Sequence, residues 1–161
     1  MAQIRIATYN LWSSDVLFPE RLDAACEELA RVDADLLALQ EVRLDTHDHD
    51  ATDVASHICD RLGYAHALAC PYASGDSEGL ALLSKHAFSR IDGPTEDRGQ
   101  SFDGGGLRAC FTIGTTKLSL TNVHLDYTSI ATREHQILIM SRWIDATGDT
   151  SRYEVLLGDF N

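Results

Sequence analysis

The order of apolar patterns along the chain constrains its fold more than any other feature. Residues 4–12 alternate between apolar and polar side chains and predict a strand, and residues 36–42 form the short apolar run typical of a buried strand. Helical spacing of apolar residues predicts one helix that begins near Pro19 and a second over about residues 51–62. This alternation predicts an α/β arrangement with helices packed on a sheet.

From residue 64 onward the pattern changes to successive strands separated by glycine-containing turns. A third helix is expected at about residues 129–146, and a last strand at 154–158. Antiparallel strands after helix–strand alternation predict an α/β sandwich in which helices cover the outer face of a mixed sheet. The intervening strands are expected at residues 64–70, 79–85, 87–91, 107–113 and 116–125.

Some conspicuous side chains have structural interpretations. Trp12 and Trp143 are expected in the core, because no basic patch surrounds either of them. Arg108 could contact a phosphate, but an exposed position on a strand is the favoured interpretation. The third helix is expected to bury Ile130, Ile137, Leu138, Ser141 and Ile144.

Length and charge restrict the classes of function. A chain of 161 residues and 17.7 kDa is expected to form about one domain, over residues 1–161. Its 13 basic and 25 acidic residues give a formal charge of −12. This charge repels phosphate backbones and anionic lipid, and so disfavours a general nucleic-acid or membrane binder. It does not exclude an enzyme that approaches phosphate through a divalent cation.

The sequence favours a cytoplasmic protein. It has neither a signal-peptide pattern at its N-terminus nor an apolar run approaching the roughly 18 residues of a membrane span. No two cysteines have CxxC spacing, and each lies in an apolar neighbourhood typical of a buried free thiol. These cysteines are Cys26, Cys59, Cys70 and Cys110. A reducing compartment fits them best, and no pattern specifies an oligomeric state.

Polar side chains stand at the ends of four apolar strands, where a rigid scaffold can present them to a common cleft. Each alone has a structural explanation: a turn cap, a solvated strand end, a core histidine or a tight turn. As a set they favour a functional site more strongly. The residues are Asn10, Glu41, His124, Asp159 and Asn161.

The chemistry of this set points to a divalent metal ion. Two carboxylates at 4 Å repel each other by about 4 kcal/mol at an effective dielectric constant near 20. A cation removes that cost, and oxygen donors suit Mg²⁺ or Mn²⁺. A zinc site is disfavoured, because there is one imidazole and no HExxH spacing. Such a metal could stabilise a phosphoryl oxygen and a departing alkoxide, as phosphoester cleavage requires.

Two other segments are interpreted without a ligand. The acidic and histidine-containing stretch Asp45–Asp50 resembles a metal-binding tract, but a solvated loop at the border of the substrate site is favoured. Gly104-Gly105-Gly106 precedes a strand rather than a helix, so it is interpreted as a flexible turn and not as a phosphate-binding loop.

Five short motifs occur in the order found in the endonuclease/exonuclease/phosphatase superfamily, which the chain resembles from residue 4 to 161. The resemblance implies a four-layer αββα sandwich of the deoxyribonuclease-like kind, with the active site at one end of the paired sheets. The motifs are Asn10, the segment Leu39-Gln40-Glu41-Val42, the segment Gly79–Lys85, Asn122-Val123-His124-Leu125, and Gly158-Asp159-Phe160-Asn161.

The resemblance also implies roles for individual residues. Glu41 would bind Mg²⁺, and Asn10 would help to position the metal and the phosphate. His124 would hydrogen-bond the phosphate or assist the leaving oxygen. Asp159 would orient or activate the attacking water, and Asn161 would stabilise the transition state. Asp126, two residues after His124, is a candidate substrate-facing or supporting group.

The chain departs from the family in two respects. Abasic-site endonucleases have a tyrosine at the position of His124, which argues against that branch. The late metal-associated aspartate and the Asp-His pair that supplies the family's basic histidine do not follow Asn161. Of the second sheet, only the strand that ends at Gly158 is expected. We therefore interpret the chain as the N-terminal portion of an enzyme, and expect it to be inactive or nearly so alone.

The sequence thus predicts a Mg²⁺-dependent phosphoesterase that acts by in-line attack of an activated water. A phosphorylated small molecule or a lipid headgroup is the favoured substrate. One alternative is an endonuclease acting on DNA or RNA, which the negative charge disfavours. Another is a non-catalytic binding module with the same fold, against which the intact set of polar residues argues.

Overall fold

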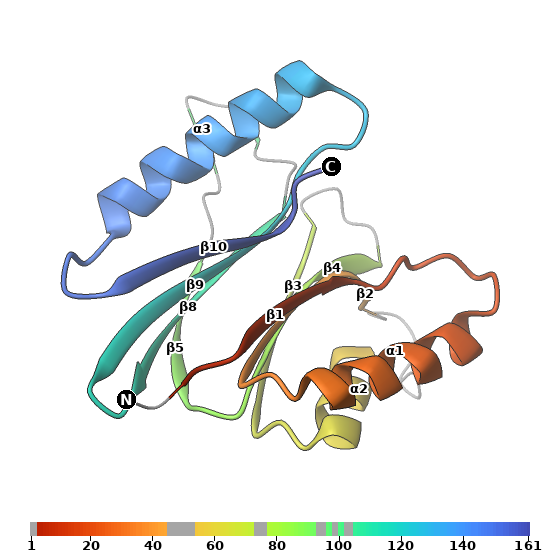
Figure 1. Cartoon of the computed structure of the whole chain (residues 1–161). Coiled ribbons are helices and arrows are strands. Elements are labelled where there is room, and N and C mark those ends of the chain that lie inside the picture. Colours follow the sequence, from red (N-terminus) through yellow and green to blue (C-terminus); the bar gives the residue numbers. More distant parts are fainter. Residues whose placement is uncertain (1–2, 45–53, 73–76, 93–95, 98–99, 102–104) are drawn as a thin grey trace.

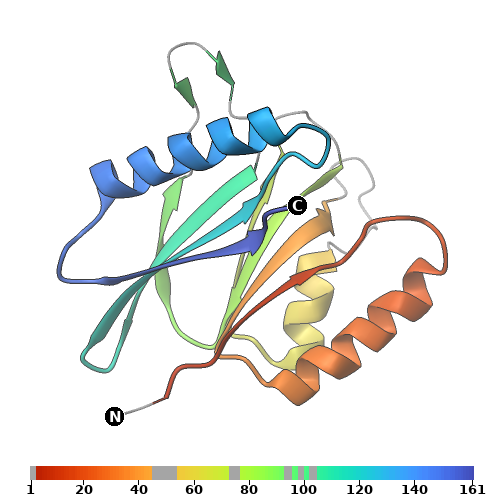
Figure 2. The same cartoon turned by 45° about the horizontal axis from the view of Figure 1, so that its top comes forward.

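Two four-stranded sheets pack face to face, and helices cover both outer faces (Figures 1 and 2). This arrangement is seen in a computed structural model of the chain. The structure describes residues 3–44, 54–72, 77–92, 96–97, 100–101 and 105–161.

The first sheet has the strand order β1-β2-β4-β3. β1 (Ile6–Asn10) runs parallel to β2 (Leu36–Arg43), whereas β4 (Glu78–Ser84) is antiparallel to both β2 and β3 (His66–Pro71). The first two helices lie on the outer face of this sheet (Figure 1). They are α1 (Phe18–Val32) and α2 (Val54–Leu62).

The second sheet has the order β10-β9-β8-β5, with α3 (Ile130–Thr147) on its outer face. β10 runs parallel to β9, and the other neighbours are antiparallel. The short strands β6 (Glu96–Asp97) and β7 (Gln100–Ser101) form a separate pair. The strands of the second sheet are β5 (Phe88–Asp92), β8 (Gly105–Ile113), β9 (Thr116–His124) and β10 (Tyr153–Asp159).

Three apolar clusters separate the four layers. Successive residues of β2 point to opposite faces, so Leu37 packs with α1 and α2 whereas Leu36 packs between the sheets against residues such as Phe111. The third cluster, which includes Val123 and Met140, joins the second sheet to α3. The predicted αββα sandwich is therefore confirmed.

The expected content of the second sheet was wrong. The sequence predicted only the strand that ends at Gly158, but β5, β8 and β9 also belong to this sheet. An alternating apolar pattern predicts where a strand lies in the sequence, but not which other strand it pairs with. The β8–β9 hairpin pairs with β10 instead of extending the first sheet, and its inner face packs against β2 and β4.

Several side chains lie elsewhere than predicted. Trp12 is 58% exposed, because β1 ends at Asn10 and the chain turns with a φ of 50° at Trp12. On α3, Ile130 and Leu138 are exposed while Ile139 is buried. Apolar residues occur on several sides of this helix, so their spacing does not single out one face.

Arg108 was also misplaced by the sequence analysis, which favoured an exposed strand position. Its side chain is 1% exposed. It donates hydrogen bonds to Glu154 of β10 over 2.5 Å and to Thr147 of α3 over 2.6 Å. A charged residue on a strand can be buried where a partner from a distant segment neutralises it.

The cysteines and the glycine-rich segment can be compared in part with their predicted positions. Cys26, Cys59 and Cys110 are buried free thiols, and Cys70 is half-buried. Gly105 and Gly106 are part of β8, not of a turn. The segment Asp45–Asp50 and Gly104 lie outside the described residues. Within the described part of the chain, no helix is long and apolar enough to span a membrane.

Candidate active site

Two pairs of parallel strands, one in each sheet, bring the candidate residues to one edge of the sandwich. Asn10 is the last residue of β1 and pairs in register with Gln40, next to Glu41 on β2. In the other sheet, Asp159 at the end of β10 lies opposite His124 at the end of β9. Parallel strands end at the same edge, so four residues distant in sequence become neighbours.

Asn10 connects the two carboxylates of the site. Its Nδ2 donates to Oε1 of Glu41 over 2.9 Å and to Oδ2 of Asp159 over 2.8 Å. Its Oδ1 accepts the backbone N–H of Trp12 over 2.8 Å. The amide therefore acts as a donor that holds two negative groups in place, with its oxygen already engaged.

The backbone of Glu41 departs from the regular strand. β2 and β4 are in register at Leu39 and again at Val42, with one extra residue on β2 between these points. Such a β-bulge redirects a side chain at a sheet edge. Glu41 has a φ of 52°, and its Oε2 accepts the backbone N–H of Ser13 over 3.1 Å.

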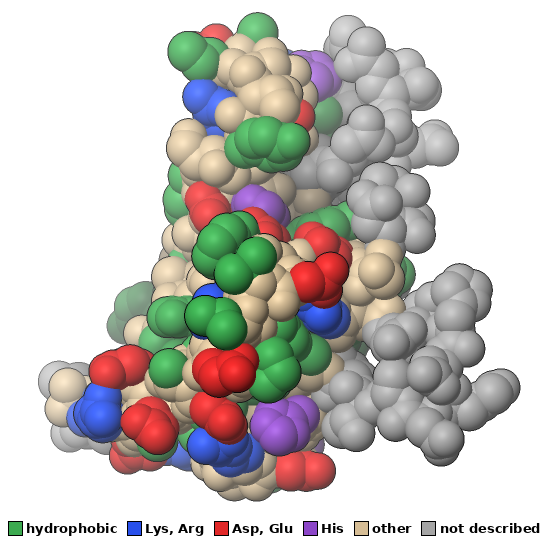
Figure 3. All heavy atoms as spheres, turned by 90° about the vertical axis from the view of Figure 1, so that its right-hand side faces the viewer, with side chains coloured by type: hydrophobic (Ala, Val, Ile, Leu, Met, Phe, Trp, Pro, Cys, Tyr) green, Lys and Arg blue, Asp and Glu red, His purple; other side chains and the backbone are tan. Residues whose placement is uncertain are grey.

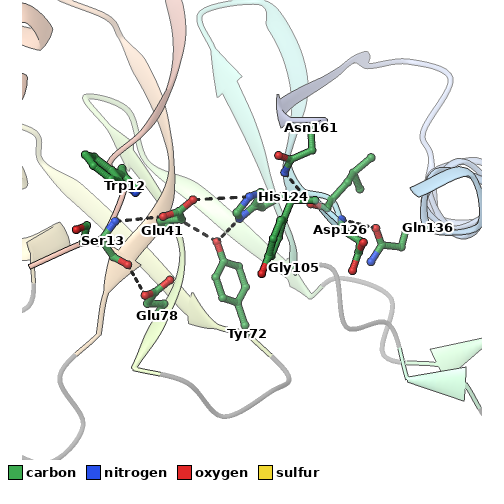
Figure 4. A pocket seen from close by; sticks show the side chains of 13 residues that line it. Trp12, Ser13, Glu41, Tyr72, Glu78, Gly105, His124, Asp126, Gln136 and Asn161 are labelled. Atoms are coloured by element: carbon green, nitrogen blue, oxygen red, sulfur yellow. Dashed lines mark hydrogen bonds and ion pairs between the residues drawn. The ribbon is translucent and has the colours of Figure 1, made fainter. Parts of the chain in front are cut away.

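His124 and Tyr72 form the opposite wall. The hydroxyl of Tyr72 lies 2.8 Å from Nδ1 of His124 and accepts the backbone N–H of Glu41 over 3.1 Å. On its other side, Nε2 of His124 is 3.9 Å from Oε1 of Glu41 (Figure 4). The imidazole thus lies between a phenol and a carboxylate.

The loop after β10 is fixed by Asp159 and Asn161. Oδ1 of Asp159 accepts the backbone N–H of Asn161 over 2.9 Å, and Nδ2 of Asn161 donates to the carbonyl of Leu125 over 2.9 Å. Gly158 has a φ of 141°, and a Cβ there would lie 1.9 Å from the carbonyl oxygen of Val123. Only glycine can therefore precede the aspartate.

The pKa values of Asp159 and Tyr72 are shifted in opposite directions. Burial raises the pKa of Asp159, but hydrogen bonds from Asn10 and Asn161 and the nearby His124 lower it more, so the net shift is downward. Burial raises the pKa of Tyr72, and the surrounding carboxylates raise it further, although the hydrogen bond from the Glu41 N–H lowers it in part. Asp159 is therefore a carboxylate, and Tyr72 a neutral phenol, at neutral pH.

Asp126 has a different environment from the other candidates. Its Oδ1 accepts three hydrogen bonds: 2.7 Å from the N–H of Ser129, and 2.8 Å from both the N–H and the hydroxyl of Thr128. These bonds lower its pKa. Gln136 accepts its backbone N–H, and Arg133 donates to its carbonyl. Asp126 shapes the turn into α3 and also lines the pocket.

A pocket of about 680 Å³ opens beside these residues (Figure 4). Four predicted site residues line it: Glu41, His124, Asp126 and Asn161. Asn10 and Asp159 do not line it, but are hydrogen-bonded to residues that do. The other lining residues are Trp12, Ser13, Ser14, Tyr72, Glu78, Gly105, Leu125, Tyr127 and Gln136.

Sequence reasoning missed Tyr72 and the pair formed by Ser13 and Glu78, whose side chains are hydrogen-bonded. Glu78 begins β4, one residue before the strand that the sequence predicted, and was not singled out. Tyr72 directly follows β3, and a polar-tipped aromatic residue at a strand end is the one signal that could have identified it.

The donor set bears on which metal could bind. Within the described ranges, no group of three or more His, Cys, Asp or Glu side chains is arranged to hold a metal ion. A closed structural zinc site needs four such ligands. Mg²⁺ commonly uses one or two carboxylates and completes its shell with water and substrate phosphate. The half-buried Glu41 carboxylate facing the pocket fits the second pattern.

A sequence model described as the endonuclease/exonuclease/phosphatase family matches residues 7–161. A comparison with curated protein sequences found no match.

Solved structures share the fold at low sequence identity. A humanized D. rerio TDP2 superposes with a TM-score of 0.76 at 18% identity, covering 98% of this chain and 62% of that one. ANGEL2, a 2',3'-cyclic phosphatase in complex with adenosine-2',3'-vanadate, gives 0.75 at 22%, covering 98% and 53%. A functionally unknown protein from Enterococcus faecalis V583 gives 0.73 at 24%, covering 98% and 67%. The chain thus spans about half to two thirds of the length of these structures.

Proposed function

The chain belongs to the endonuclease/exonuclease/phosphatase family, and from this premise we propose that its site hydrolyses a phosphoester. In the proposed reaction, a water oxygen attacks phosphorus in line with the ester oxygen. The new P–O bond forms as the ester P–O bond breaks, the attacking water gives up one proton, and the leaving oxygen takes one up.

One observation carries this proposal: the amide of Asn10 holds Glu41 and Asp159 together near His124, and Glu41 and His124 line the pocket. Two carboxylates gathered by a donor and facing an imidazole offer both a metal ligand and a water-orienting base. At the open edge of a sheet, water could solvate each carboxylate separately. A purely structural role therefore does not explain why the two carboxylates and the imidazole are held together there.

Each residue has a proposed role. Asp159, ionised at neutral pH, accepts a hydrogen bond from the attacking water and orients it. His124 hydrogen-bonds the phosphoryl or leaving oxygen through Nε2. Asn161 stabilises the negative charge on the phosphoryl oxygens in the transition state, and Asp126 contacts the substrate from the pocket wall.

Glu41 would hold Mg²⁺, or Mn²⁺ in its place, and Asn10 would position the ion by fixing the Glu41 carboxylate. A bound divalent cation supplies charge stabilisation at the phosphoryl and leaving oxygens. An amide rotation would be needed for Asn10 to offer its oxygen as a ligand, because Trp12 now occupies it.

The favoured substrate is a phosphorylated small molecule or lipid headgroup, and a nucleic acid is the alternative. On the face shown in Figure 3, the few lysine and arginine side chains of the described residues are scattered among acidic ones. Together with the charge of −12, this surface gives little attraction for a polyanionic backbone. We place the protein in the cytoplasm on its cysteine content.

Calorimetry with Mn²⁺, and then with inorganic phosphate in the presence of Mg²⁺, tests the site directly. We expect Mn²⁺ binding that Glu41→Gln weakens at least tenfold, and phosphate binding that requires the metal. Asp149→Asn, which changes an exposed carboxylate remote from the pocket, is the matched control. Metal binding that Glu41→Gln leaves unchanged would exclude this assignment, and metal binding without phosphate binding would favour a non-catalytic module.

Turnover is measured on a chromogenic phosphodiester, a phosphomonoester and single-stranded RNA. We expect slow, metal-dependent hydrolysis that Asp159→Asn abolishes. Fast cleavage of RNA alone would favour the nuclease.

A further inference from the structure

The side chain of Tyr72 joins two site residues that come from different sheets. Its hydroxyl accepts the N–H of Glu41, on β2, and lies 2.8 Å from Nδ1 of His124, on β9 (Figure 4). Neither the family resemblance nor the sequence patterns gives this tyrosine a role.

The bulge in β2 explains why the backbone N–H of Glu41 is available to bond with a side chain. Register with β4 is lost between Leu39 and Val42, so the N–H of Glu41 has no strand partner. The Tyr72 hydroxyl accepts this N–H over 3.1 Å. One lone pair of the phenol oxygen is therefore occupied by the backbone of the proposed metal ligand.

Hydrogen-bond accounting then fixes the direction of the contact with His124. A phenol has one proton to donate, and a neutral imidazole has one protonated and one unprotonated nitrogen. Were Nδ1 of His124 the donor, the proton of Tyr72 would face no acceptor in the described contacts. With the hydroxyl donating to Nδ1, the Tyr72 proton has an acceptor, and the imidazole proton lies on Nε2, which faces the pocket and the Glu41 carboxylate 3.9 Å away.

The ring of Tyr72 is held in the position that this contact needs. Gly105 pairs in register with His124. A Cβ at residue 105 would lie 2.7 Å from Cε1 of Tyr72, so only glycine leaves room for the ring. The backbone N–H of Tyr72 donates to the carbonyl of Glu78 over 3.0 Å, which fixes the start of the side chain.

We propose that Tyr72 is a positioning residue that keeps His124 as the Nε2–H tautomer, with Nε2 as a hydrogen-bond donor toward the pocket. In this state Nε2 cannot accept the proton of an attacking water. It can donate to a phosphoryl or leaving oxygen. The catalytic consequence rests on the proposed function, whereas the tautomer itself does not.

Nitrogen-15 NMR of the metal-free full chain tests the tautomer without any substrate. Long-range proton–nitrogen correlations are recorded near pH 8.5, where histidines are neutral, and His124 is assigned by comparison with His124→Asn. We expect His124 to be protonated at Nε2 alone in the wild type, and to become a mixture of tautomers in Tyr72→Phe. Tyr64→Phe, which removes a hydroxyl from a buried tyrosine in the other core, should leave the spectrum unchanged.

Two results would overturn the proposal: a wild-type His124 protonated at Nδ1, or an unchanged Nε2–H tautomer in a folded Tyr72→Phe. The first needs only the wild type, so it decides the matter even if the variant unfolds. In turnover assays Tyr72→Phe should lower kcat about 10–100-fold with little change in KM. A tautomer change in a protein whose Mn²⁺ binding Glu41→Gln leaves unchanged would sustain this inference while refuting the proposed function.

Discussion

Nδ2 of Asn10 donates a hydrogen bond of 2.8 Å to Oδ2 of Asp159, a residue 149 positions later in the chain. Asn10 ends the first strand of one sheet and Asp159 the last strand of the other, and β1 and β10 contact each other. The candidate site thus exists only when the two sheets are packed together. Changes at the site should therefore be measurable as changes in the free energy of unfolding.

Replacing Asn10 should destabilise the metal-free protein, and aspartate should be worse than alanine. Asn10→Ala removes the donor between Glu41 and Asp159 and leaves the two carboxylates facing each other, at a cost of about 2 kcal/mol. Asn10→Asp adds a third negative charge at the same place. Urea unfolding measures both variants, and millimolar Mg²⁺ should restore part of the loss in Asn10→Asp.

The control for this comparison is Asn161→Ala. The Asn161 amide donates only to the carbonyl of Leu125 among the described contacts, so its loss leaves no unpaired charge and should cost about 1 kcal/mol. An Asn10→Asp protein as stable as Asn10→Ala would show that the carboxylates are not close enough to repel.

The stability of the protein should decrease in acid partly through Asp159. Its pKa is raised by burial but lowered more by Asn10, Asn161 and His124, so it lies below the ordinary value near 3.9. A carboxyl with a lowered pKa in the folded state stabilises the protein above the unfolded pKa, and this contribution is lost as pH falls through the folded pKa. Asn10→Ala removes the largest of the lowering contacts.

Urea unfolding of wild type and Asn10→Ala at pH values from about 6 to 2.5 checks this expectation. The difference in unfolding free energy should be largest near neutrality and shrink below about pH 4, where the carboxyl is protonated in the unfolded state. A difference that is constant over this range, or grows in acid, would contradict the assigned hydrogen bond.

The sequence was sufficient to predict that Asn10, Glu41, His124 and Asp159 lie close together, because each of them stands at or near the end of a strand. An apolar run gives the strand, and a polar residue at its carboxyl end lies where parallel strands terminate together, as Glu41 and His124 do. Tyr72 could not be found in this way. Its contacts depend on a bulge 31 residues earlier and a histidine 52 residues later, which are features of tertiary packing.

The side-chain errors have a common cause. The spacing of apolar residues shows which side chains are apolar, but not which side chains from distant segments pack against them. Arg108 is buried because Glu154, on another strand of the same sheet, neutralises it, and Trp12 is exposed because its strand ends two residues earlier. The strand pairing of the second sheet was missed for the same reason: pairing is a relation between segments.

Removing the partner of Arg108 should be costly. Its guanidinium is 1% exposed and lies 2.5 Å from Glu154, whose side chain is 30% exposed. Glu154→Ala leaves a buried unpaired charge, for which we expect a loss of about 3–5 kcal/mol in urea unfolding. Arg108→Met should cost less, because Glu154 can be hydrated, and Arg108→Met combined with Glu154→Leu should recover most of the stability.

The exposed pair of Arg152 and Asp149 is the reference for this measurement. Its aspartate side chain is 47% exposed, so Asp149→Ala should cost no more than about 1 kcal/mol. If Glu154→Ala is no more destabilising than Asp149→Ala, the buried ion pair is not formed.

Glycine should be a better replacement for Glu41 than alanine. Glu41 has a φ of 52°, and a left-handed backbone costs a residue with a Cβ about 1–2 kcal/mol. Both variants lose the hydrogen bonds from Asn10 and Ser13, but only alanine keeps the strain. In urea unfolding we therefore expect Glu41→Gly to be about 1 kcal/mol more stable than Glu41→Ala.

At an ordinary strand position the order should reverse. Thr112 is an exposed residue of β8 with a negative φ, and there glycine should be less stable than alanine by about 0.5–1 kcal/mol. Opposite signs at the two positions would locate the strain in the backbone of Glu41. The strained conformation is the one that turns the N–H of Glu41 toward Tyr72 and its carboxylate toward the pocket. An alanine variant at 41 as stable as the glycine variant would mean that this orientation costs the fold nothing.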